Sequence, residues 1–124
     1  MIYEIEIPKA YNLSHNKGFI ELFEREKLYL KPNLRLIDIA QISDIPTYEI
    51  SKYISTNLNS NFQDFVNNYR VREAKKQISC ESNRHLTLEA IGQASGFNSR
   101  SSFFRVFKKL SGLTPKQFKA KMKS

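Results

Sequence analysis

The sequence predicts an all-α fold made of two similar helical units joined by one long helix. The main observation is an internal repeat of apolar and turn-forming residues. Five positions recur 52 residues later: Leu36, Ile39, Ala40, Asp44 and Ile45 match Leu88, Ile91, Gly92, Gly96 and Phe97. Six more recur after 53: Ile50, Lys52, Ile54, Asn59, Asn61 and Phe65 match Phe103, Arg105, Phe107, Gly112, Thr114 and Phe118. Each copy reads as helix, turn, helix, so the sequence predicts a paired helix-turn-helix.

The first copy shows helical spacing in three segments. Apolar periodicity predicts helices over 19–30, 36–43 and about 47–55, and Pro32 closes the first of them. Asp44 stands in the turn, where a left-handed residue is needed and Asp is tolerated. In the third helix Ile50, Tyr53 and Ile54 recur at i, i+3 and i+4 and predict its buried stripe. Its outer face then carries Tyr48, Ser51, Lys52 and Ser55.

The connecting segment predicts a helix of almost five turns that begins after Asn61, a residue type that caps helices well. Its apolar residues recur at helical spacing and are Phe62, Phe65, Val66, Tyr69, Ala74 and Ile78. Its other side is basic and bears Arg70, Arg72, Lys75 and Lys76.

The second copy carries stronger end signals. Thr87 is expected to cap a helix to about residue 95, with Glu89 in the first turn complementing the helix dipole. Gly96 supplies the left-handed turn, and Ser99 caps a helix to about residue 110. The predicted buried row of that helix is Phe103, Val106, Phe107 and Leu110, and the outer face holds Arg100, Ser101, Phe104, Arg105 and Lys108. Thr114 followed by Pro115 predicts the start of a last helix.

These elements predict four segments: a tail or upstream linker at 1–18, a first helix-turn-helix subdomain at 19–60, a linker helix at 61–80 and a second subdomain at 81–124. Residues 2–7 alternate apolar and polar side chains like a short strand, which Pro8 ends.

The charge is uneven along the chain. The net charge of +8 divides into 7 basic and 9 acidic residues in 1–64 and 13 basic and 3 acidic residues in 65–124. The basic half therefore predicts a polyanionic partner, either nucleic acid or an anionic membrane. One cysteine, Cys80, and two histidines predict neither an internal disulfide nor a metal site, and the single thiol favours a reducing, cytoplasmic setting. No nucleophilic triad or phosphate-binding glycine loop is present in the sequence, so we expect no enzyme and no cofactor.

The stretch LTLEAIGQASGFNSRSSFFRVFKKLSGLTPKQFK, residues 86–119, resembles the signature of the AraC/XylS family of bacterial transcription regulators. The matching residues are Gly96, Phe97, Phe103, Arg105, Phe107, Lys108, Lys109, Gly112, Leu113, Thr114 and Pro115. Residues 69–78 are also similar to the connecting helix of the family, and the similarity extends over about 19–120. The first copy departs from the pattern at Asp44, Pro46 and Asn59.

The resemblance implies a homeodomain-like pair of subdomains that place two recognition helices in successive major-groove segments of double-stranded DNA. A groove about 12 Å wide accepts one helix, and the second must lie about 34 Å along the axis. By matching position, the residues expected to contact bases are Tyr48, Ser51, Lys52, Arg100, Ser101, Phe104 and Arg105. Those expected to contact phosphates, directly or through helix-start amides, are Asn61, Arg70, Arg72, Lys75, Lys76, Ser99, Lys108 and Lys109.

Two alternatives stay open at this point. Phe104 is aromatic but falls outside the buried row, so it either contacts a thymine methyl or packs against a neighbouring element. The chain as a whole either binds DNA or is a basic helical module for an acidic protein or a membrane surface.

The resemblance further implies recruitment of RNA polymerase, with activation the commoner mode of the family and repression the alternative. The length leaves no room for the sensor or effector domain that most members carry. We therefore expect a carboxyl-terminal piece of a longer regulator, cytoplasmic or attached to a membrane-tethered sensor, rather than a small stand-alone member.

Overall fold

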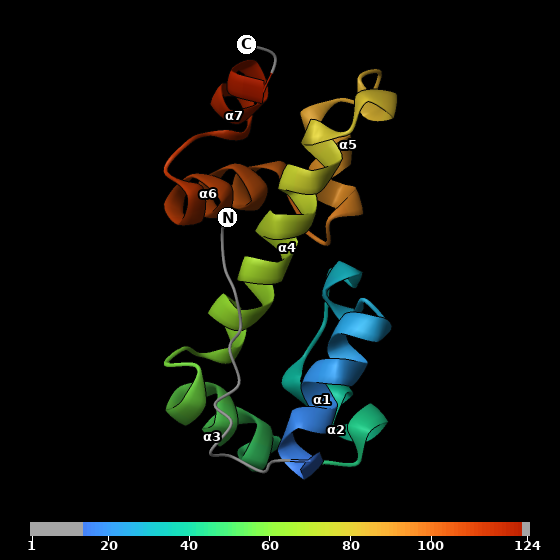
Figure 1. Ribbon diagram of the computed structural model, residues 1–124, viewed down its shortest axis with the longest axis vertical. Helices are drawn as coiled ribbons and strands as arrows, with labels where there is room; N and C mark the ends of the chain where they lie inside the picture. The colour runs from blue at the N-terminus through green and yellow to red at the C-terminus, as the bar shows by residue number, and fades with distance from the viewer. Residues whose placement is uncertain (1–13, 123–124) are drawn as a thin grey trace. The chain divides into compact units, whose positions relative to one another are not determined.

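The computed structural model describes residues 14–122, and every regular element in that range is helical (Figure 1). The α-helices are α1 (Ser14–Arg25), α2 (Leu36–Ser43), α3 (Thr47–Asn57), α4 (Phe62–Ser79), α5 (Leu88–Ala94), α6 (Arg100–Ser111) and α7 (Pro115–Met122). Two 3-10 turns, η1 (Leu28–Leu30) and η2 (Glu81–Asn83), complete the described elements. The predicted all-α class is confirmed, and the strand expected at 2–7 lies outside the described residues.

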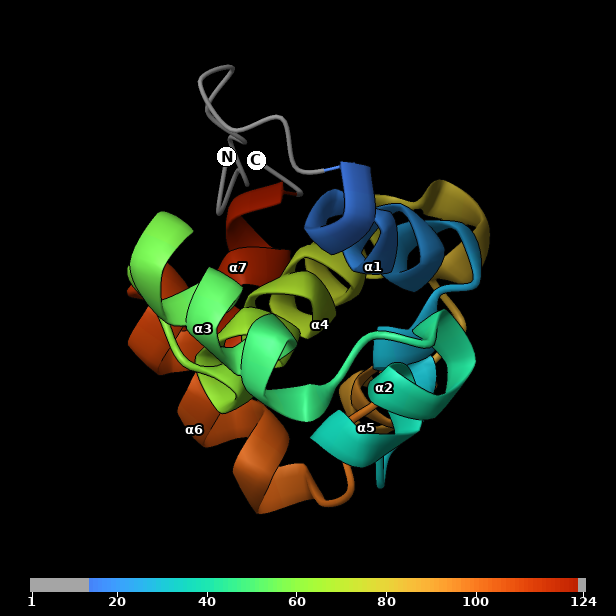
Figure 2. The same ribbon diagram turned by 90° about the horizontal axis from the view of Figure 1, so that it is seen from below.

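The described residues divide into two units after Val66, named here the first unit (14–66) and the second unit (67–122). In the first unit α1 packs on both α2 and α3, and α2 packs on α3 (Figure 2). The ring centroids of Phe23 and Phe65 lie 4.9 Å apart, and Phe19 meets Tyr53 edge-on at 5.7 Å. The predicted stripe of α3 is buried as expected, which fixes the opposite face of this helix outward.

The helix expected over 19–30 is wrong in its bounds. It starts earlier, at Ser14, and ends at Arg25, because Lys27 takes a left-handed conformation with φ 49° before η1. This reversal lets Leu28 become buried. Burying a Leu side chain contributes about 1.5–3 kcal/mol, which is enough to offset the roughly 1–2 kcal/mol that a left-handed non-glycine residue costs.

The turns of the two copies match as the repeat predicts. Asp44 has φ 59° where Gly96 has φ 104°, and Asn59 has φ 48° where Gly112 has φ 82°. Asp and Asn are the non-glycine residues that adopt this conformation most readily. The first copy therefore keeps the turn geometry at both positions where it lacks glycine.

The linking helix α4 is continuous across the boundary between the units. Asn61 caps it as predicted, because the Asp64 amide donates to Asn61 Oδ1 at 2.8 Å. The apolar residues Phe65, Val66 and Ala74 are buried.

Arg70 does not lie on the exposed side of α4, where it was predicted together with Arg72, Lys75 and Lys76. Only 6% of Arg70 is exposed, whereas Arg72 and Lys76 are exposed as predicted. Tyr69 and Val71 beside it are also buried. Three consecutive buried residues, about 100° apart around a helix, mean that α4 is enclosed on more than the single stripe that an i, i+3, i+4 pattern describes.

The second unit packs α4, α5 and α6 around one apolar cluster. Its buried members are Val71, Ala74, Ile91, Phe97, Phe103, Val106 and Phe107. The predicted caps all form: Ala90 N–H donates to Thr87 Oγ1 at 3.0 Å, Ser102 N–H to Ser99 Oγ at 3.1 Å and Gln117 N–H to Thr114 Oγ1 at 3.1 Å. Capped ends and a buried row together fix which face of α6 points outward.

Candidate nucleic-acid interface

The outer face of α3 presents the three residues predicted to contact bases in the first unit. Tyr48 is 68% exposed, and Ser51 and Lys52 are exposed beside it. Positions 48, 51 and 52 follow i, i+3 and i+4 spacing, so their side chains share one face of the helix. The aromatic ring of Tyr48 is therefore exposed on the same face of α3 as Ser51 and Lys52.

The outer face of α6 presents a comparable but more basic set. Arg100, Ser101 and Arg105 are exposed as predicted, whereas Phe104 is half-buried. In the last turn Lys108 and Lys109 are exposed too. The face opposite the buried row therefore carries Arg100 and Ser101 in its first turn and two lysines in its last turn.

Phe104 takes the packing role that one of the two alternatives proposed. Its ring meets the ring of Phe103 edge-on, with centroids 5.4 Å apart, and it packs against the apolar cluster of the second unit. Part of the ring is still exposed. Contact with a thymine methyl stays a prediction for that exposed part.

Arg100 makes two contacts within the second unit. Its Nε donates to Glu89 Oε2 at 2.6 Å, and its guanidinium carbon lies 4.8 Å from the centroid of the Phe104 ring. The pKa of Glu89 lies below its ordinary value because its own backbone N–H, and then the Arg100 guanidinium, stabilise the carboxylate. The sequence predicts only one role for Glu89, at the dipole of α5. A contact between residues 11 apart in different helices leaves no periodic signal by which it could be found.

The basic residues of α4 differ in how they are held. Lys75 is half-buried, its Nζ lies 5.3 Å from the centroid of the Phe118 ring, and burial lowers its pKa. Burial also lowers the pKa of Arg70, which offers no exposed cation to a phosphate as it stands. Arg72 and Lys76 are the two exposed cations of this group.

The helix starts at Asn61 and Ser99 differ in their charge environment. Asn61 donates to the Asp64 carboxylate at 3.3 Å, so a negative group already stands at the start of α4. At the start of α6 the neighbouring charged residues are Arg100 and its partner Glu89, whose charges offset each other, and the first turn of α6 itself contains no acidic residue. The electrostatic surroundings therefore suit a phosphate better at Ser99 than at Asn61.

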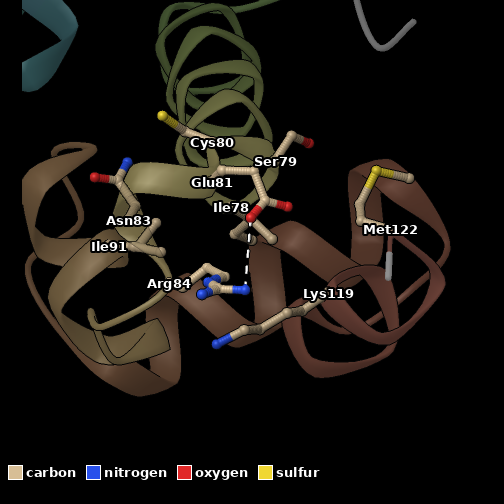
Figure 3. A pocket seen from close by; sticks show the side chains of 9 residues that line it. All are labelled: Ile78, Ser79, Cys80, Glu81, Asn83, Arg84, Ile91, Lys119 and Met122. Atoms are coloured by element: carbon tan, nitrogen blue, oxygen red, sulfur yellow. Dashed lines mark ion pairs between the residues drawn. The ribbon is translucent and has the colours of Figure 1, made fainter. Parts of the chain in front are cut away.

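The second unit contains a cavity of about 380 Å³ whose lining includes no residue of α6 (Figure 3). Its lining consists of Ile78, Ser79, Cys80, Glu81, Asn83, Arg84, Ile91, Lys119 and Met122. Arg84 is paired with Glu81 at 3.7 Å across an exposed rim. Because neither α3 nor α6 contributes to this cavity, the candidate interface is a pair of helix faces and not a pocket.

A family model described as a helix-turn-helix domain matches residues 39–121, which includes α3, α4 and α6. The chain belongs to the AraC/XylS family of DNA-binding transcription regulators. Family and fold are those of regulators and not of enzymes.

Solved structures share the architecture of this AraC-family chain. An AraC-type transcriptional regulator from Chromobacterium violaceum matches with a TM-score of 0.77 at 18% identity, over 92% of this chain and 96% of that one. The C-terminal domain of a two-component response regulator from Fusobacterium nucleatum matches with a TM-score of 0.67 at 26% identity, over 81% of this chain and 96% of that one.

Curated relatives are uncharacterized HTH-type transcriptional regulators of Staphylococcus aureus strains, 29% identical over 93 residues. The aligned region is 75% of this chain and 12% of the relative, so the chain spans about an eighth of the length of these proteins. Within the described residues, no helix is both long and apolar enough to cross a membrane.

Proposed function

We propose that this AraC-family chain binds double-stranded DNA sequence-specifically by inserting α3 and α6 into successive major-groove segments. The observation that carries the proposal is the repeated design of the two units. In each, the second helix of the helix-turn-helix has a buried apolar row behind it and an exposed polar face in front. A helix of this kind fits a major groove about 12 Å wide.

Each face has groups that can read base edges. Arg100 and Arg105 offer guanidinium donors to O6 and N7 of guanine, a bidentate contact worth on the order of 1–3 kcal/mol of discrimination. Ser51 and Ser101 offer hydroxyl groups, and Lys52 offers an ammonium group, as single hydrogen-bond donors to base edges. Tyr48 offers an apolar ring for van der Waals contact and a hydroxyl for a hydrogen bond. Base reading by these side chains is the finer part of the proposal.

Phosphate contacts are assigned to four exposed cations, to the half-buried Lys75 and to one helix start. The candidates are Arg72, Lys75, Lys76, Lys108, Lys109 and the amides after Ser99. We leave out Arg70 because it is buried, and Asn61 because Asp64 stands beside it. If each of these five cations neutralises one phosphate, log affinity should fall against log salt with a slope of about −4.5.

The regulatory role follows from the family and from the names of the relatives. We infer that this chain acts in the cytoplasm, where its binding to DNA recruits or positions RNA polymerase. Activation of transcription is the commoner mode of the family, and repression is the alternative. A sensor or effector domain of the same polypeptide is expected to control it, because a structural relative is the C-terminal domain of a two-component response regulator.

Selection from random duplex DNA tests the proposal. We expect enrichment of a motif with two half-elements about ten base pairs apart, the repeat of B-form DNA. Binding without enrichment, with equal affinity for an acidic protein or for anionic vesicles, would instead favour the helical interaction module and overturn the assignment.

A further inference from the structure

Arg100 is held from two sides by residues of different helices. The Glu89 carboxylate, in the first turn of α5, accepts from Nε at 2.6 Å. The ring of Phe104, one turn along α6, lies under the guanidinium at 4.8 Å. The Arg100 side chain is nevertheless 68% exposed. An exposed arginine with two defined contacts is oriented and still reachable.

Both contacts rest on rigid parts of the second unit. Phe104 is fixed edge-on against the buried ring of Phe103. Phe103 in turn lies so close to Gly92 that a Cβ built there would be 2.5 Å from the ring. Gly92 belongs to α5, the helix that also carries Glu89. The packing of α5 on α6 therefore determines where the acid and the ring stand relative to Arg100.

We propose that Glu89 is a positioning residue that aims Arg100 at a guanine edge and keeps it from binding a phosphate. The inference rests on the proposed function, because it assumes that the outer face of α6 enters the major groove.

The geometry of the guanidinium supports this role. Arginine has five N–H donors in a planar fork, and the contact with Glu89 uses the one on Nε. The terminal amino groups stay available, and their spacing matches O6 and N7 of guanine. A free arginine loses about 2 kcal/mol of rotamer entropy when it is fixed. Glu89 and Phe104 reduce that loss by orienting the side chain before DNA arrives.

The charge of Glu89 supports the second half of the role. A carboxylate beside Arg100 compensates its positive charge and repels a phosphate oxygen that approaches the same guanidinium. The guanine edge carries only the partial negative charges of O6 and N7, so the same carboxylate repels it less. The pair should therefore weaken nonspecific backbone binding more than it weakens base contact.

The first unit indicates that the pair is not needed to hold two such helices together. At the positions equivalent to Glu89, Arg100 and Phe104, the first copy has Ile37, Thr47 and Ser51. In the first unit α2 packs on α3 although no Glu, Arg or Phe stands at these three positions. An exposed ion pair is in any case worth little to stability. Besides the role of Glu89 at the start of α5, the pair therefore serves to orient Arg100.

The test compares Glu89→Ala with Glu81→Ala in binding to a selected duplex and to a scrambled one at several salt concentrations. Glu81 is a matched control because it is an exposed acid of the second unit that pairs with Arg84 at 3.7 Å. Both substitutions remove one negative charge. We expect Glu89→Ala to lower the ratio of specific to nonspecific affinity by about tenfold, as for one weakened base contact. Its salt dependence on scrambled DNA should steepen by about one.

Glu89→Gln should fall between the wild type and Glu89→Ala, since an amide oxygen can still accept from Nε. Equal ratios for the Glu89→Ala and Glu81→Ala variants would overturn the inference. Loss of preference for a cytosine would also overturn it, because Glu89 would then read a base itself. If the wild type prefers no sequence at all, the proposed function fails; if it is selective but Glu89→Ala changes nothing, only the positioning role fails.

Discussion

Replacing Gly92 by Ala should destabilise the second unit, although Ala is normally the better helix residue. Gly92 lies inside α5 and faces the ring of Phe103. An added Cβ would lie 2.5 Å from Cδ2 and 2.6 Å from Cγ of that ring. Neither atom can withdraw easily, because Cγ is next to the backbone of α6 and the ring is packed against Phe97 at 5.2 Å and Phe107 at 5.7 Å.

Two opposing effects set the magnitude. Overpacking of a well-filled core costs about 1–3 kcal/mol, whereas replacing a helical Gly by Ala gains about 1 kcal/mol. With the ring held on several sides we expect the upper part of the first range. The free energy of unfolding should therefore fall by about 1–2 kcal/mol.

Urea unfolding followed by circular dichroism measures this change, with Gly18→Ala as the matched control. Gly18 also lies in a helix, but a Cβ there meets nothing within 4 Å. This control should gain about 0.5–1 kcal/mol. A Gly92→Ala variant that is stabilised as much as Gly18→Ala would refute the argument from packing.

The partner residue gives an independent check. The equivalent positions of the first unit hold Ala40 and Ile50 in place of Gly92 and Phe103. The double variant Gly92→Ala, Phe103→Ile should therefore be more stable than the sum of the two single changes predicts. Strict additivity would mean that the two positions do not interact.

Three further outcomes are expected. Arg105→Ala should relax selection at one base pair by about 1–3 kcal/mol, whereas Lys109→Ala should weaken all duplexes alike and reduce the salt slope by about one; the reverse pattern would exchange their roles. Phe104→Ser should lower the free energy of unfolding by about 1 kcal/mol through the lost ring pair, and an unchanged urea midpoint would show that packing is not its role. The pKa of Glu89 is lower in the folded protein than in the unfolded chain, so its ion pair with Arg100 is fully formed above the unfolded pKa and is lost as the pH falls through the folded pKa. The ratio of specific to nonspecific affinity should therefore be constant near neutral pH and fall only in acid. Binding titrations at several pH values would check this.

Much of the fold was predictable because its signals are local. Caps at Thr87 and Ser99, and left-handed turns at Asp44 and Gly96, depend on residues within a few positions of each other. The internal repeat added a second reading of the same pattern. Faces of α3 and α6 then followed from the periodicity of their buried rows.

What the sequence did not predict depends on contacts between elements. Helix α1 ends before Lys27, whose left-handed conformation is strained but allows Leu28 to be buried. No local sequence pattern predicts which of these two effects is larger. Burial of Arg70 reflects enclosure of α4 beyond one stripe. The contact of Arg100 with Glu89 needs α5 and α6 to be packed first.

Binding to duplexes with one half-element altered shows whether α3 and α6 each read a separate element of the DNA. The selected duplex is prepared intact, with the first half-element scrambled, and with the second scrambled, and each is bound to the wild type, Tyr48→Ala and Arg105→Ala. Each helix is proposed to read its own element. We therefore predict that Tyr48→Ala no longer weakens binding once the element read by α3 is scrambled, but still weakens binding when the other element is scrambled. Arg105→Ala should show the same behaviour for the element read by α6. If both substitutions weaken all three duplexes equally, the two faces do not read DNA separately and the account is contradicted.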